Sequence, residues 1–582
     1  MKKIIYIISL VFISLCTHAQ YYLRGEIRDA NNSALSNVKI LLHSTEYVYY
    51  SGNGGSFGIP ISNPTDSVTI SSEGYQEIDT RLDASKYQYI TLKLLHPPPA
   101  QQKNTLLSSI KNLKPEDRTT WSVGGETYNS LVENDFVAAS KFPETGFAIN
   151  INKASYSNIR RFINMGGTVP PDAVRIEEML NYFNFNYTFP LEDSTFSFRS
   201  YLSPCPWNEN DQLLFLNVCA AKINLEDVPP ANLVFLIDIS GSMDLPNRLP
   251  LLKSSFRLLV NNLRDIDTVS IVVYGSTVGV WLPPTPGNNR EEILKSIEEL
   301  SPGGPTPGEA GIHAAYRLAK SQFIKGGNNR VILATDGDFN VGQTTEEELE
   351  KLIVQQKQWG VYLTCLGVGM GNYKDSKLQV LAERGSGNFA YIDNEKEAEK
   401  VLMKEFTQTI YSVADDAYLN VDFNPDLVKR YRLIGFDNKS SALSDSSNGL
   451  QGGEIGSGNS LVAMFEVTPV NNNIDSINNL KANLANVTIN YKLPNDSSSR
   501  SSNFKCSFTS NNFDYLPAPI RFASSVVVFG ELLRKSKYMK HVSWNDLIEL
   551  SQKSVDHNDV LQEEFITLVT KAKKIYRKEK RK

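Results

Sequence analysis

The chain has 582 residues, too many for a single hydrophobic core, so several domains are expected. Hydrophobic residues make up 41% of the chain and charged residues 21%, which is ordinary for globular proteins. The formal net charge of −5 argues against a nucleic-acid partner, because phosphate binding requires a basic face.

The N-terminus has the pattern of a secretory signal peptide. Two lysines precede an apolar stretch at residues 4–15, which is too short for a membrane span, and small residues suited to cleavage follow it. We expect residues 1–19 to be removed and the mature chain to be exported. Cys16 raises an alternative, a lipid-anchored protein associated with a membrane, but Leu15 stands where a small residue is usual.

Four further cysteines lie in the mature chain: Cys205, Cys219, Cys365 and Cys506. An exported protein could pair them in disulfides. They show no CxxC spacing and no neighbouring histidine cluster, which argues against zinc. Cys205 and Cys219 could bridge adjacent strands, but buried unpaired thiols are the expectation, above all for Cys365 in its apolar strand.

Residues 20–95 alternate apolar and polar residues between turn signals, which predicts a small β-sandwich. The segments Gly25-Glu26-Ile27-Arg28-Asp29, Gly54-Gly55-Ser56-Phe57 and Glu73-Gly74-Tyr75 resemble the carboxypeptidase-regulatory-like (transthyretin-like) domain, a non-catalytic module. A departure is Ser51-Gly52-Asn53, where that family commonly has a Thr-Asp pair. Residues 96–125 are polar and contain three consecutive prolines at 97–99, which indicates a linker.

The remainder divides into four regions by its pattern. Residues 126–229 mix helices and strands, residues 230–412 alternate strand and helix, residues 413–515 return to alternating strands, and residues 516–582 are helical. Strand-rich stretches therefore lie on both sides of the α/β region. We hypothesise that they pair into one β-domain into which the α/β region is inserted.

The α/β region has continuous apolar strands separated by amphipathic helices, which predicts a doubly wound parallel sheet with ligands at the carboxyl ends of its strands. A long helix is also predicted before this region, at residues 171–183. The predicted strands are 233–238, 268–274, 330–334, 361–368 and 388–392, and the predicted helices are 249–263, 290–300, 308–325, 346–359, 375–382 and 395–412.

A cluster of oxygen-bearing side chains follows the first of these strands. Asp238, Ser240 and Ser242 stand at alternate positions just past the strand end, which places three oxygens on one turn. Hard divalent cations such as Mg²⁺ choose oxygen ligands in near-octahedral geometry. Two later loops add Thr306, just before a helix, and Asp336, at the end of another buried strand. All three loops should meet at the same edge of the sheet, where the strand order switches.

The pattern DxSxS after a parallel strand, with the later Thr and Asp, resembles the metal-ion-dependent adhesion site (MIDAS) of von Willebrand factor type A domains. The resemblance implies Ser240, Ser242 and Thr306 as direct ligands, with Asp238 and Asp336 as supporting carboxylates. It implies Mg²⁺, or another divalent cation such as Mn²⁺ or Ca²⁺, with an open position that accepts an Asp or Glu carboxylate from a partner protein. Pro305 departs from the family, where a Ser commonly precedes the Thr.

A closer likeness runs from about residue 126 to the C-terminus. The chain is similar to the YfbK-like family of bacterial exported von Willebrand type A proteins, which implies the periplasm, the outer membrane or the cell surface. A departure is residues 149–153, where the family tends to carry Asp-Val-Asp-Thr. The segments that carry the likeness are Ala154-Ser155-Tyr156-Ser157-Asn158, Ser203-Pro204-Cys205-Pro206-Trp207, Ala334-Thr335-Asp336-Gly337-Asp338, Tyr431-Arg432-Leu433-Ile434-Gly435 and Gly453-Glu454-Ile455-Gly456-Ser457.

Three functions are compatible with these patterns. The first is a metal-dependent protein-binding module for adhesion, envelope assembly or scaffolding. The second is a hydrolase, against which stands the lack of an HExxH helix or a GxSxG turn. The third is a structural envelope protein with a vestigial site. We expect a binding protein and not an enzyme.

Overall fold

The computed structural model describes residues 21–93 and 120–579. Gaps fall at residues 30–31, 53, 73–74, 124–125, 186, 192–193, 225, 227, 276, 305–307, 338–345, 372, 406–407, 409–410, 437–451, 471–482, 495 and 497. The predicted signal peptide, Cys16 and most of the predicted linker lie outside the described residues. The chain divides into two compact units, residues 1–105 and 106–582. Within the described ranges, we find no helix with the length and apolarity needed to cross a membrane.

The N-terminal unit consists of two sheets around one core. Side chains alternate along each strand, so that Phe57, Ile59 and Ile61 point inward to meet Val68 and Ile70 of the other sheet. This arrangement is a β-sandwich, and the carboxypeptidase-regulatory-like assignment stays a prediction. One sheet has the order β4-β1-β7 and the other β3-β2-β5-β6, with β1 at Tyr21–Asp29, β2 at Lys39–Leu42, β3 at Val48–Tyr50, β4 at Ser56–Ile61, β5 at Thr65–Ser71, β6 at Ile78–Asp83 and β7 at Tyr87–Leu92.

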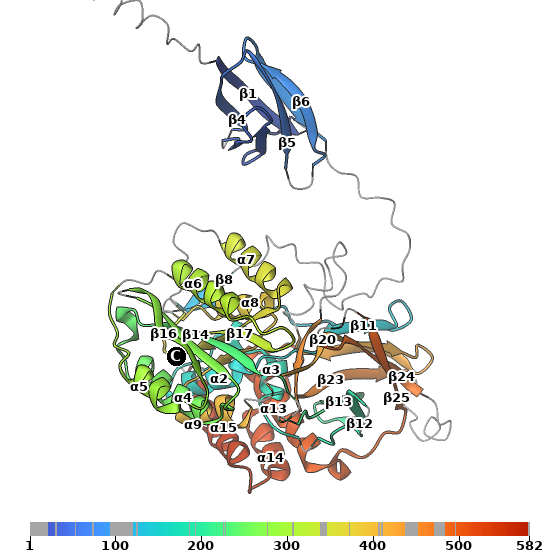
Figure 1. Cartoon of the computed structure of the whole chain (residues 1–582). Coiled ribbons are helices and arrows are strands. Elements are labelled where there is room, and N and C mark those ends of the chain that lie inside the picture. Colours follow the sequence, from blue (N-terminus) through green and yellow to red (C-terminus); the bar gives the residue numbers. More distant parts are fainter. Residues whose placement is uncertain are drawn as a thin grey trace, which may run out of the picture. The chain divides into compact units, whose positions relative to one another are not determined.

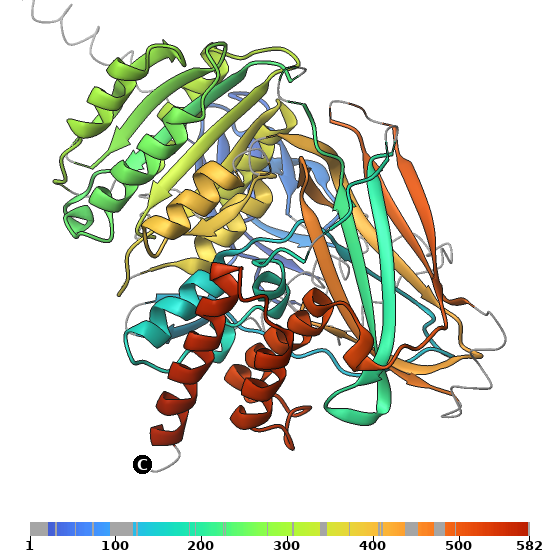
Figure 2. The same ribbon diagram turned by 90° about the horizontal axis from the view of Figure 1, so that it is seen from below.

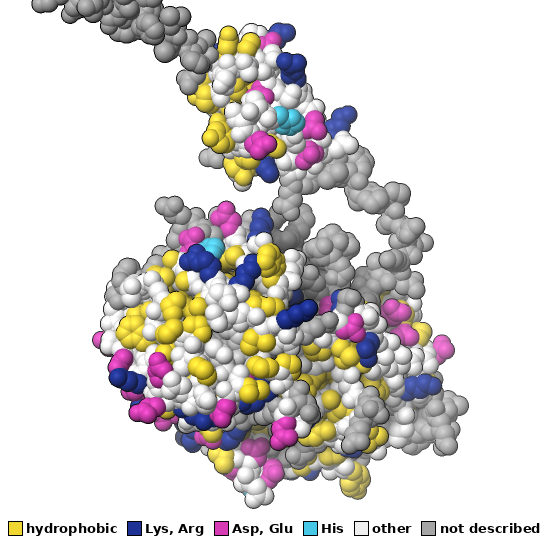
Figure 3. All heavy atoms as spheres, in the orientation of Figure 1, with side chains coloured by type: hydrophobic (Ala, Val, Ile, Leu, Met, Phe, Trp, Pro, Cys, Tyr) yellow, Lys and Arg dark blue, Asp and Glu magenta, His cyan; other side chains and the backbone are white. Residues whose placement is uncertain are grey.

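The outer face of the three-stranded sheet carries exposed aromatic side chains. Tyr22 on β1 and Tyr87 and Tyr89 on β7 are 52%, 50% and 75% exposed. The register of the two strands sets Arg24 beside Tyr87 and Glu26 beside Tyr89. Figure 3 shows apolar side chains gathered on the surface of this unit. These tyrosines therefore contribute nothing to the core of the sandwich.

The α/β unit (residues 231–404) is built on a six-stranded sheet (Figure 1). Four neighbouring strand pairs are parallel, and the chain passes from β14 to β15 on one side and later to β17 on the other side of β14. The strand order therefore switches at β14, where ligand sites of such sheets lie. The order is β16-β15-β14-β17-β18-β19, with β14 at Ala231–Asp238, β15 at Thr268–Tyr274, β16 at Val278–Pro286, β17 at Asn328–Thr335, β18 at Val361–Gly367 and β19 at Phe389–Tyr391.

Helices cover both faces of this sheet, which confirms the doubly wound prediction. Phe235 and Ile237 of β14 pack against α4 and α5, while Val234 and Leu236 pack against α6, α7 and α8. The two sets of helices lie on opposite sides of the sheet in Figure 1. Their bounds are Leu249–Asn261 for α4, Arg290–Glu298 for α5, Gly308–Ser321 for α6, Glu346–Gln358 for α7, Asp375–Arg384 for α8 and Glu395–Glu399 for α9, which continues as the π-helix Lys400–Lys404.

Three sequence predictions are wrong in detail. The sheet is not wholly parallel, because β16 pairs antiparallel to β15 at one edge. The predicted helix at 171–183 is broken into a 3-10 turn, Pro171–Ala173, and the short helix α3, Ile176–Leu180, because Arg175 between them is extended. The predicted linker extends too far, since β8 (Thr120–Val123) pairs with β9 (Glu126–Asn129).

A flanking body (residues 120–223 and 411–579) surrounds the α/β unit in sequence. Strand β13 pairs with β23 over eight residue pairs, from Gln212–Val467 to Cys219–Ser460. This pairing confirms that the stretches on either side of the α/β unit form one β-domain. One sheet has the order β10-β21-β23-β13-β12 and the other β11-β20-β24-β25, with β22 beside β20. Bounds are Val137–Ala138 (β10), Glu144–Ala148 (β11), Phe196–Cys205 (β12), Asn208–Ala220 (β13), Ser412–Phe423 (β20), Val428–Ile434 (β21), Gly453–Gly456 (β22), Ser460–Pro469 (β23), Asn483–Lys492 (β24) and Arg500–Ser507 (β25).

The flanking body is layered. Leu214 and Leu216 of β13 face the second sheet, while Leu213 and Phe215 face a layer of helices. Figure 2 shows the red C-terminal helices beside the teal helix α2 and the strands of this body. The helices are α2 at Ala154–Asn164, α13 at Ala518–Arg534, α14 at Trp544–Ser554 and α15 at Val560–Glu579. The four cysteines named above are all buried and unpaired.

Buried ion pairs fix the α/β unit in the flanking body. Arg160 of α2 donates to Asp393, and Arg175 donates to Asp375, with nitrogen–oxygen distances of 2.5 and 2.6 Å. A third guanidinium crosses the boundary in the other direction, from Arg330 of β17 to Glu454 at 2.9 Å. A buried guanidinium needs a carboxylate partner, so these pairs set the orientation of the α/β unit.

Candidate metal centre

The first metal loop follows directly from the end of β14. Asp238 is the last residue of that strand, and a 3-10 turn, Gly241–Met243, begins after Ser240. The N–H of Ser240 donates to Asp238 Oδ1 at 2.9 Å, which folds the loop back over the carboxylate. The hydroxyl oxygens of Ser240 and Ser242 lie 3.1 Å apart. Ser240 is buried and Ser242 is exposed, so the pair lies at the surface of the α/β unit with Ser240 on its inner side.

Asp238 is held from both neighbouring strands. Its Oδ2 accepts hydrogen bonds from the hydroxyls of Thr335 at 2.9 Å and Tyr274 at 3.2 Å. Both donors follow from the sheet, because β14 lies between β15 and β17 and Asp238 stands beside Tyr274 in the register. Burial raises the pKa of Asp238 to about 6, although hydrogen bonds from Ser240 act in the opposite direction. A carboxylate engaged in this way suits a supporting role.

The second metal loop is tied to the first by backbone hydrogen bonds. Gly303 N–H donates to the Ile239 carbonyl at 2.7 Å, and Gly241 N–H donates to the Gly304 carbonyl at 3.0 Å. Thr306, the predicted third hydroxyl ligand, lies outside the described residues together with Pro305. Its placement among the ligands stays a prediction.

The third metal loop carries Asp336, which is 2% exposed. Arg248, at the start of α4, donates to Asp336 Oδ2 at 2.6 Å. The same guanidinium donates to the carbonyl oxygens of Ser242 at 2.5 Å and Met370 at 2.8 Å. It therefore joins the first and third loops and neutralises one of the two carboxylates. Asp338 lies outside the described residues.

The donor set fits a small divalent cation. Neighbouring ligand oxygens around an octahedral Mg²⁺, with bonds of about 2.1 Å, lie about 3 Å apart. The two serine hydroxyls, at 3.1 Å, have that separation. Two carboxylates and one guanidinium give the surroundings a net charge of −1, which attracts a cation without neutralising it. Among the described residues, no group of three or more His, Cys, Asp or Glu side chains could hold a metal ion.

The sequence predicted that Asp238, Ser240, Ser242 and Asp336 lie at one edge of the sheet, and the structure places all four there. It missed Tyr274, Thr335 and Arg248. Tyr274 and Thr335 end the two strands that flank β14, which is a signal that strand order would have supplied. Arg248 has no such signal, because a lone basic residue six positions after Ser242 reads as a solvated side chain.

Three family models match the chain. Residues 232–406 match the von Willebrand factor type A domain, and residues 408–575 match the family described as Uncharacterized protein YfbK, C-terminal. Residues 122–215 match a model described as von Willebrand factor. The matched segments cover the α/β unit and most of the flanking body.

The chain is also similar to individual proteins. The chain is 36% identical over 471 residues to Uncharacterized protein YfbK of Escherichia coli (strain K12), covering 77% of this chain and 81% of that protein. It is 26% identical over 212 residues to inter-alpha-trypsin inhibitor heavy chain H2 of Mesocricetus auratus, which is 35% of this chain and only 22% of that protein. A solved structure, von Willebrand factor type A from Catenulispora acidiphila, matches 66% of this chain and 91% of its own, at 15% identity and a TM-score of 0.38.

Proposed function

The chain belongs to the YfbK family, and from this premise we propose that it is a protein-interaction module that captures a partner carboxylate through a divalent metal. The interaction role follows from the von Willebrand factor type A domain, which the chain shares with inter-alpha-trypsin inhibitor heavy chains. The bound metal, the captured carboxylate of the partner and the location of the protein after export are inferred from the site and the sequence pattern. YfbK itself is described as uncharacterized, so the match shows the family and not an activity.

The pair of serine hydroxyls carries the proposal. Ser240 and Ser242 present two neutral oxygens 3.1 Å apart, and Thr306 is proposed as the third direct ligand. Neutral ligands leave a bound cation electrophilic, so Mg²⁺, or Mn²⁺ or Ca²⁺ in its place, would supply an open position for an Asp or Glu carboxylate of a partner protein.

The charges around the site also favour capture of a carboxylate. Asp238 and Asp336 are proposed to support the metal through waters, and Arg248 already neutralises one of them. A divalent cation with one net negative charge around it keeps a positive field at the open position. That field favours an anion over a neutral group. We further propose that the chain acts after export, in the periplasm or at the outer membrane or cell surface, following removal of residues 1–19.

A retention assay with and without metal tests this function. Immobilised mature protein is incubated with envelope extract in Mg²⁺ or in EDTA, and the retained proteins are identified by mass spectrometry. We expect partners that are retained only in Mg²⁺ and released by EDTA. The double variant Ser240→Ala/Ser242→Ala should retain none of them, because it lacks two proposed ligands. Free acetate in excess should compete with the partners for the open position.

The matched control is Ser254→Ala on helix α4, which removes a hydroxyl that bonds only within its own helix. It should retain the same partners as the unaltered protein. Partners that remain bound in EDTA and to the double variant would contradict metal-dependent capture. That result would favour the alternative of a structural envelope protein with a vestigial site. Turnover of a retained protein that depends on Ser240 would favour the hydrolase alternative.

A further inference from the structure

The loop between β18 and α8 (residues 368–374, described except for residue 372) lies between the metal loops and the flanking body. We call it the linking loop. On the side of the metal loops, the N–H of Val368 donates to the Thr335 carbonyl at 3.0 Å. Arg248 donates to the Met370 carbonyl at 2.8 Å while it holds Asp336. The loop is therefore in direct contact with the residues that position both proposed supporting carboxylates.

Glycines allow this close approach. A side chain at Gly369 would place its Cβ 2.7 Å from Nε of Arg248, and one at Gly337 would lie 2.5 Å from the backbone nitrogen of Lys374. Both glycines also have positive φ angles, of 79° and 87°, which other residues rarely adopt. The linking loop is therefore packed against the third metal loop without intervening side chains, so a shift of one displaces the other.

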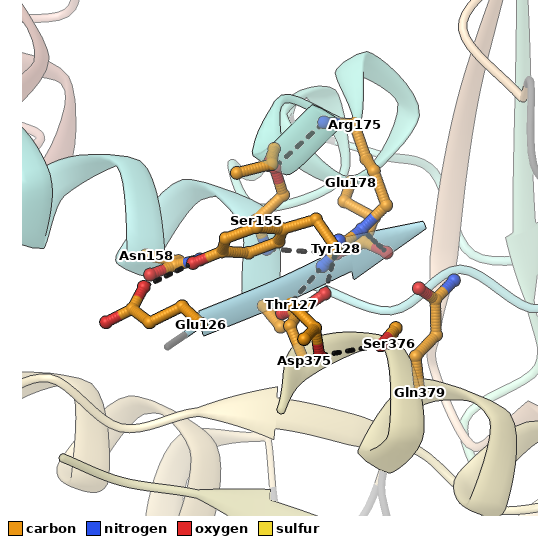
Figure 4. Close-up of polar contacts among 12 residues, drawn as sticks. Glu126, Thr127, Tyr128, Ser155, Asn158, Arg175, Glu178, Asp375, Ser376 and Gln379 are labelled. Atoms are coloured by element: carbon orange, nitrogen blue, oxygen red, sulfur yellow. Dashed lines mark hydrogen bonds and ion pairs between the residues drawn. The ribbon is translucent and has the colours of Figure 1, made fainter. Parts of the chain in front are cut away.

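On its other side the linking loop meets strand β9 of the flanking body. The N–H of Gly371 donates to Glu126 Oε1 at 2.9 Å, and the N–H of Thr127 donates to the Tyr373 carbonyl at 3.1 Å. The hydroxyls of Thr127 and Ser376 lie 3.0 Å apart. Figure 4 shows Thr127 directed toward Ser376 on helix α8, while Glu126 and Tyr128 lie toward the helices of the flanking body.

Glu126 is itself rigidly held. It is 4% exposed, and its two oxygens accept from the Arg161 guanidinium at 2.7 Å each and from the Tyr128 hydroxyl at 2.8 Å. Asn158 in turn donates to that hydroxyl at 3.0 Å (Figure 4). Burial opposes the charge of Glu126, but Arg161 and the Gly371 N–H outweigh it, so that the pKa of this carboxyl is lowered. Glu126 is thus a charged, fixed anchor for the linking loop.

We infer that Glu126 is a positioning residue for the metal centre, acting through Gly371, Met370 and Arg248 on Asp336. The inference rests on the proposed function, because it concerns the same metal. It makes the flanking body part of the binding apparatus: the body supplies the fixed point against which the third metal loop is set. The metal affinity of the α/β unit then depends on a residue of the flanking body that contacts the linking loop.

Two substitutions at one position separate positioning from stability. Glu126→Gln keeps an oxygen that accepts from Gly371 but loses the charge that faces Arg161. Glu126→Ala loses both. Both variants should have a lower denaturation temperature than the unaltered protein. Only Glu126→Ala should bind Mn²⁺ or Mg²⁺ more weakly in titration calorimetry, by about 10-fold, at the low end of the effects seen when outer-shell partners of metal ligands are removed.

Glu454→Ala is the matched control, because it also removes a buried carboxylate from a guanidinium at the same boundary, away from the linking loop. It should lower the denaturation temperature and leave the metal affinity unchanged. Equal loss of affinity in Glu126→Gln and Glu126→Ala, or an equal loss in Glu454→Ala, would overturn the positioning role and leave general destabilisation as the cause.

Two measurements do not depend on the variants binding metal. In EDTA, Glu126→Ala and Arg248→Met should lower the denaturation temperature less than additively when combined, because both residues hold the same loop. Additive effects would overturn the inference even if no metal binds. In the unaltered protein, Mg²⁺ should slow amide exchange in residues 368–374 and 126–129 by reciprocal linkage. Bound metal without such protection would also overturn it. A protein that binds no divalent metal at all, with a less-than-additive pair, would overturn only the proposed function.

Discussion

The metal loops and the boundary with the flanking body both bury polar side chains, but they satisfy them differently. At the boundary, the guanidinium of Arg175 meets Glu178 and Asp375, each at 2.6 Å, and all three side chains are at most 2% exposed. In the metal loops, the hydroxyls of Ser240 and Ser242 meet each other at 3.1 Å, beside Asp238, whose carboxylate accepts from the neutral hydroxyls of Thr335 and Tyr274. One cluster is closed on itself, and the other still has oxygen lone pairs to offer.

This difference distinguishes polar side chains that hold the structure together from polar side chains that can bind a ligand. A buried ion pair whose charges and hydrogen bonds are matched sets a geometry but has nothing left with which to bind a ligand. Neutral oxygens at the end of a parallel strand gain by binding a cation. The stability of the protein should therefore depend on the two clusters in different ways. At the boundary it should fall when one partner of an ion pair is removed, and at the metal loops it should change with the presence or absence of metal.

The largest expected effect is at the boundary. Arg175→Met leaves the carboxylates of Glu178 and Asp375 buried without their cation, which should destabilise the protein by roughly 3–5 kcal/mol. Urea denaturation followed by circular dichroism measures this loss. The control is Lys553→Met, whose partner Glu549 is solvent-exposed. It should leave the denaturation midpoint unchanged. A similar midpoint for Arg175→Met and Lys553→Met would show that the boundary pairs do not fix the α/β unit.

An intermediate effect is expected from metal on stability. A ligand at 100 times its dissociation constant stabilises the folded state by about 2.7 kcal/mol. Saturating Mg²⁺ should therefore raise the denaturation temperature of the unaltered protein. The double variant Ser240→Ala/Ser242→Ala should lose this increase while keeping its stability in EDTA. Arg175→Met should retain the increase from its lower starting value. An increase that survives in the double variant would place the metal elsewhere.

The smallest effect is the pH dependence of stability that arises from the ion pair between Arg330 and Glu454. Burial raises the pKa of Glu454 to about 7, against the opposing effect of Arg330. In the unfolded chain this carboxyl titrates near 4.3. Between these two values the folded state binds more protons, so its stability decreases as the pH rises from about 4.3 to about 7.

Glu454→Gln removes this titration. The dependence of the unfolding free energy on pH should then become flatter over the same interval, by about 1–3 kcal/mol in total, as measured by urea denaturation at each pH. The absolute stability of the variant is not diagnostic, because Arg330 loses its partner. Identical slopes in the two proteins would show that Glu454 is already ionised well below neutral pH.

The strands of the α/β unit were predictable because their signal is local. Strand β14 is an unbroken apolar run buried on both faces, and β17 and β18 repeat that pattern. The antiparallel edge strand β16 escaped notice because its segment contains Pro283, Pro284 and Pro286. Proline cannot donate to a sheet ladder, so such a segment reads as a loop although an edge strand tolerates it. The break at Arg175 was also hidden, because helical periodicity continues across it.

The serines and aspartates of the metal loops could also be predicted from the sequence, because their signal is local. Asp238, Ser240 and Ser242 share one turn, and the alternation of strand and helix places Asp336 at the same sheet edge. The pairing of β13 with β23 could be hypothesised from strand-rich stretches on both sides, but the register came only from the structure.

What the sequence by itself determined is therefore the set of proposed oxygen ligands and the sheet that presents them, since spacing along one strand and one turn is a property of neighbouring residues. Only the tertiary structure decided that Arg248 holds Asp336 and that Glu126 anchors the linking loop. Glu126 and Gly371 are 245 positions apart in the chain, and their hydrogen bond exists only because the flanking body folds against the α/β unit. No local pattern encodes such a contact, because its free energy comes from burial and charge pairing between distant segments.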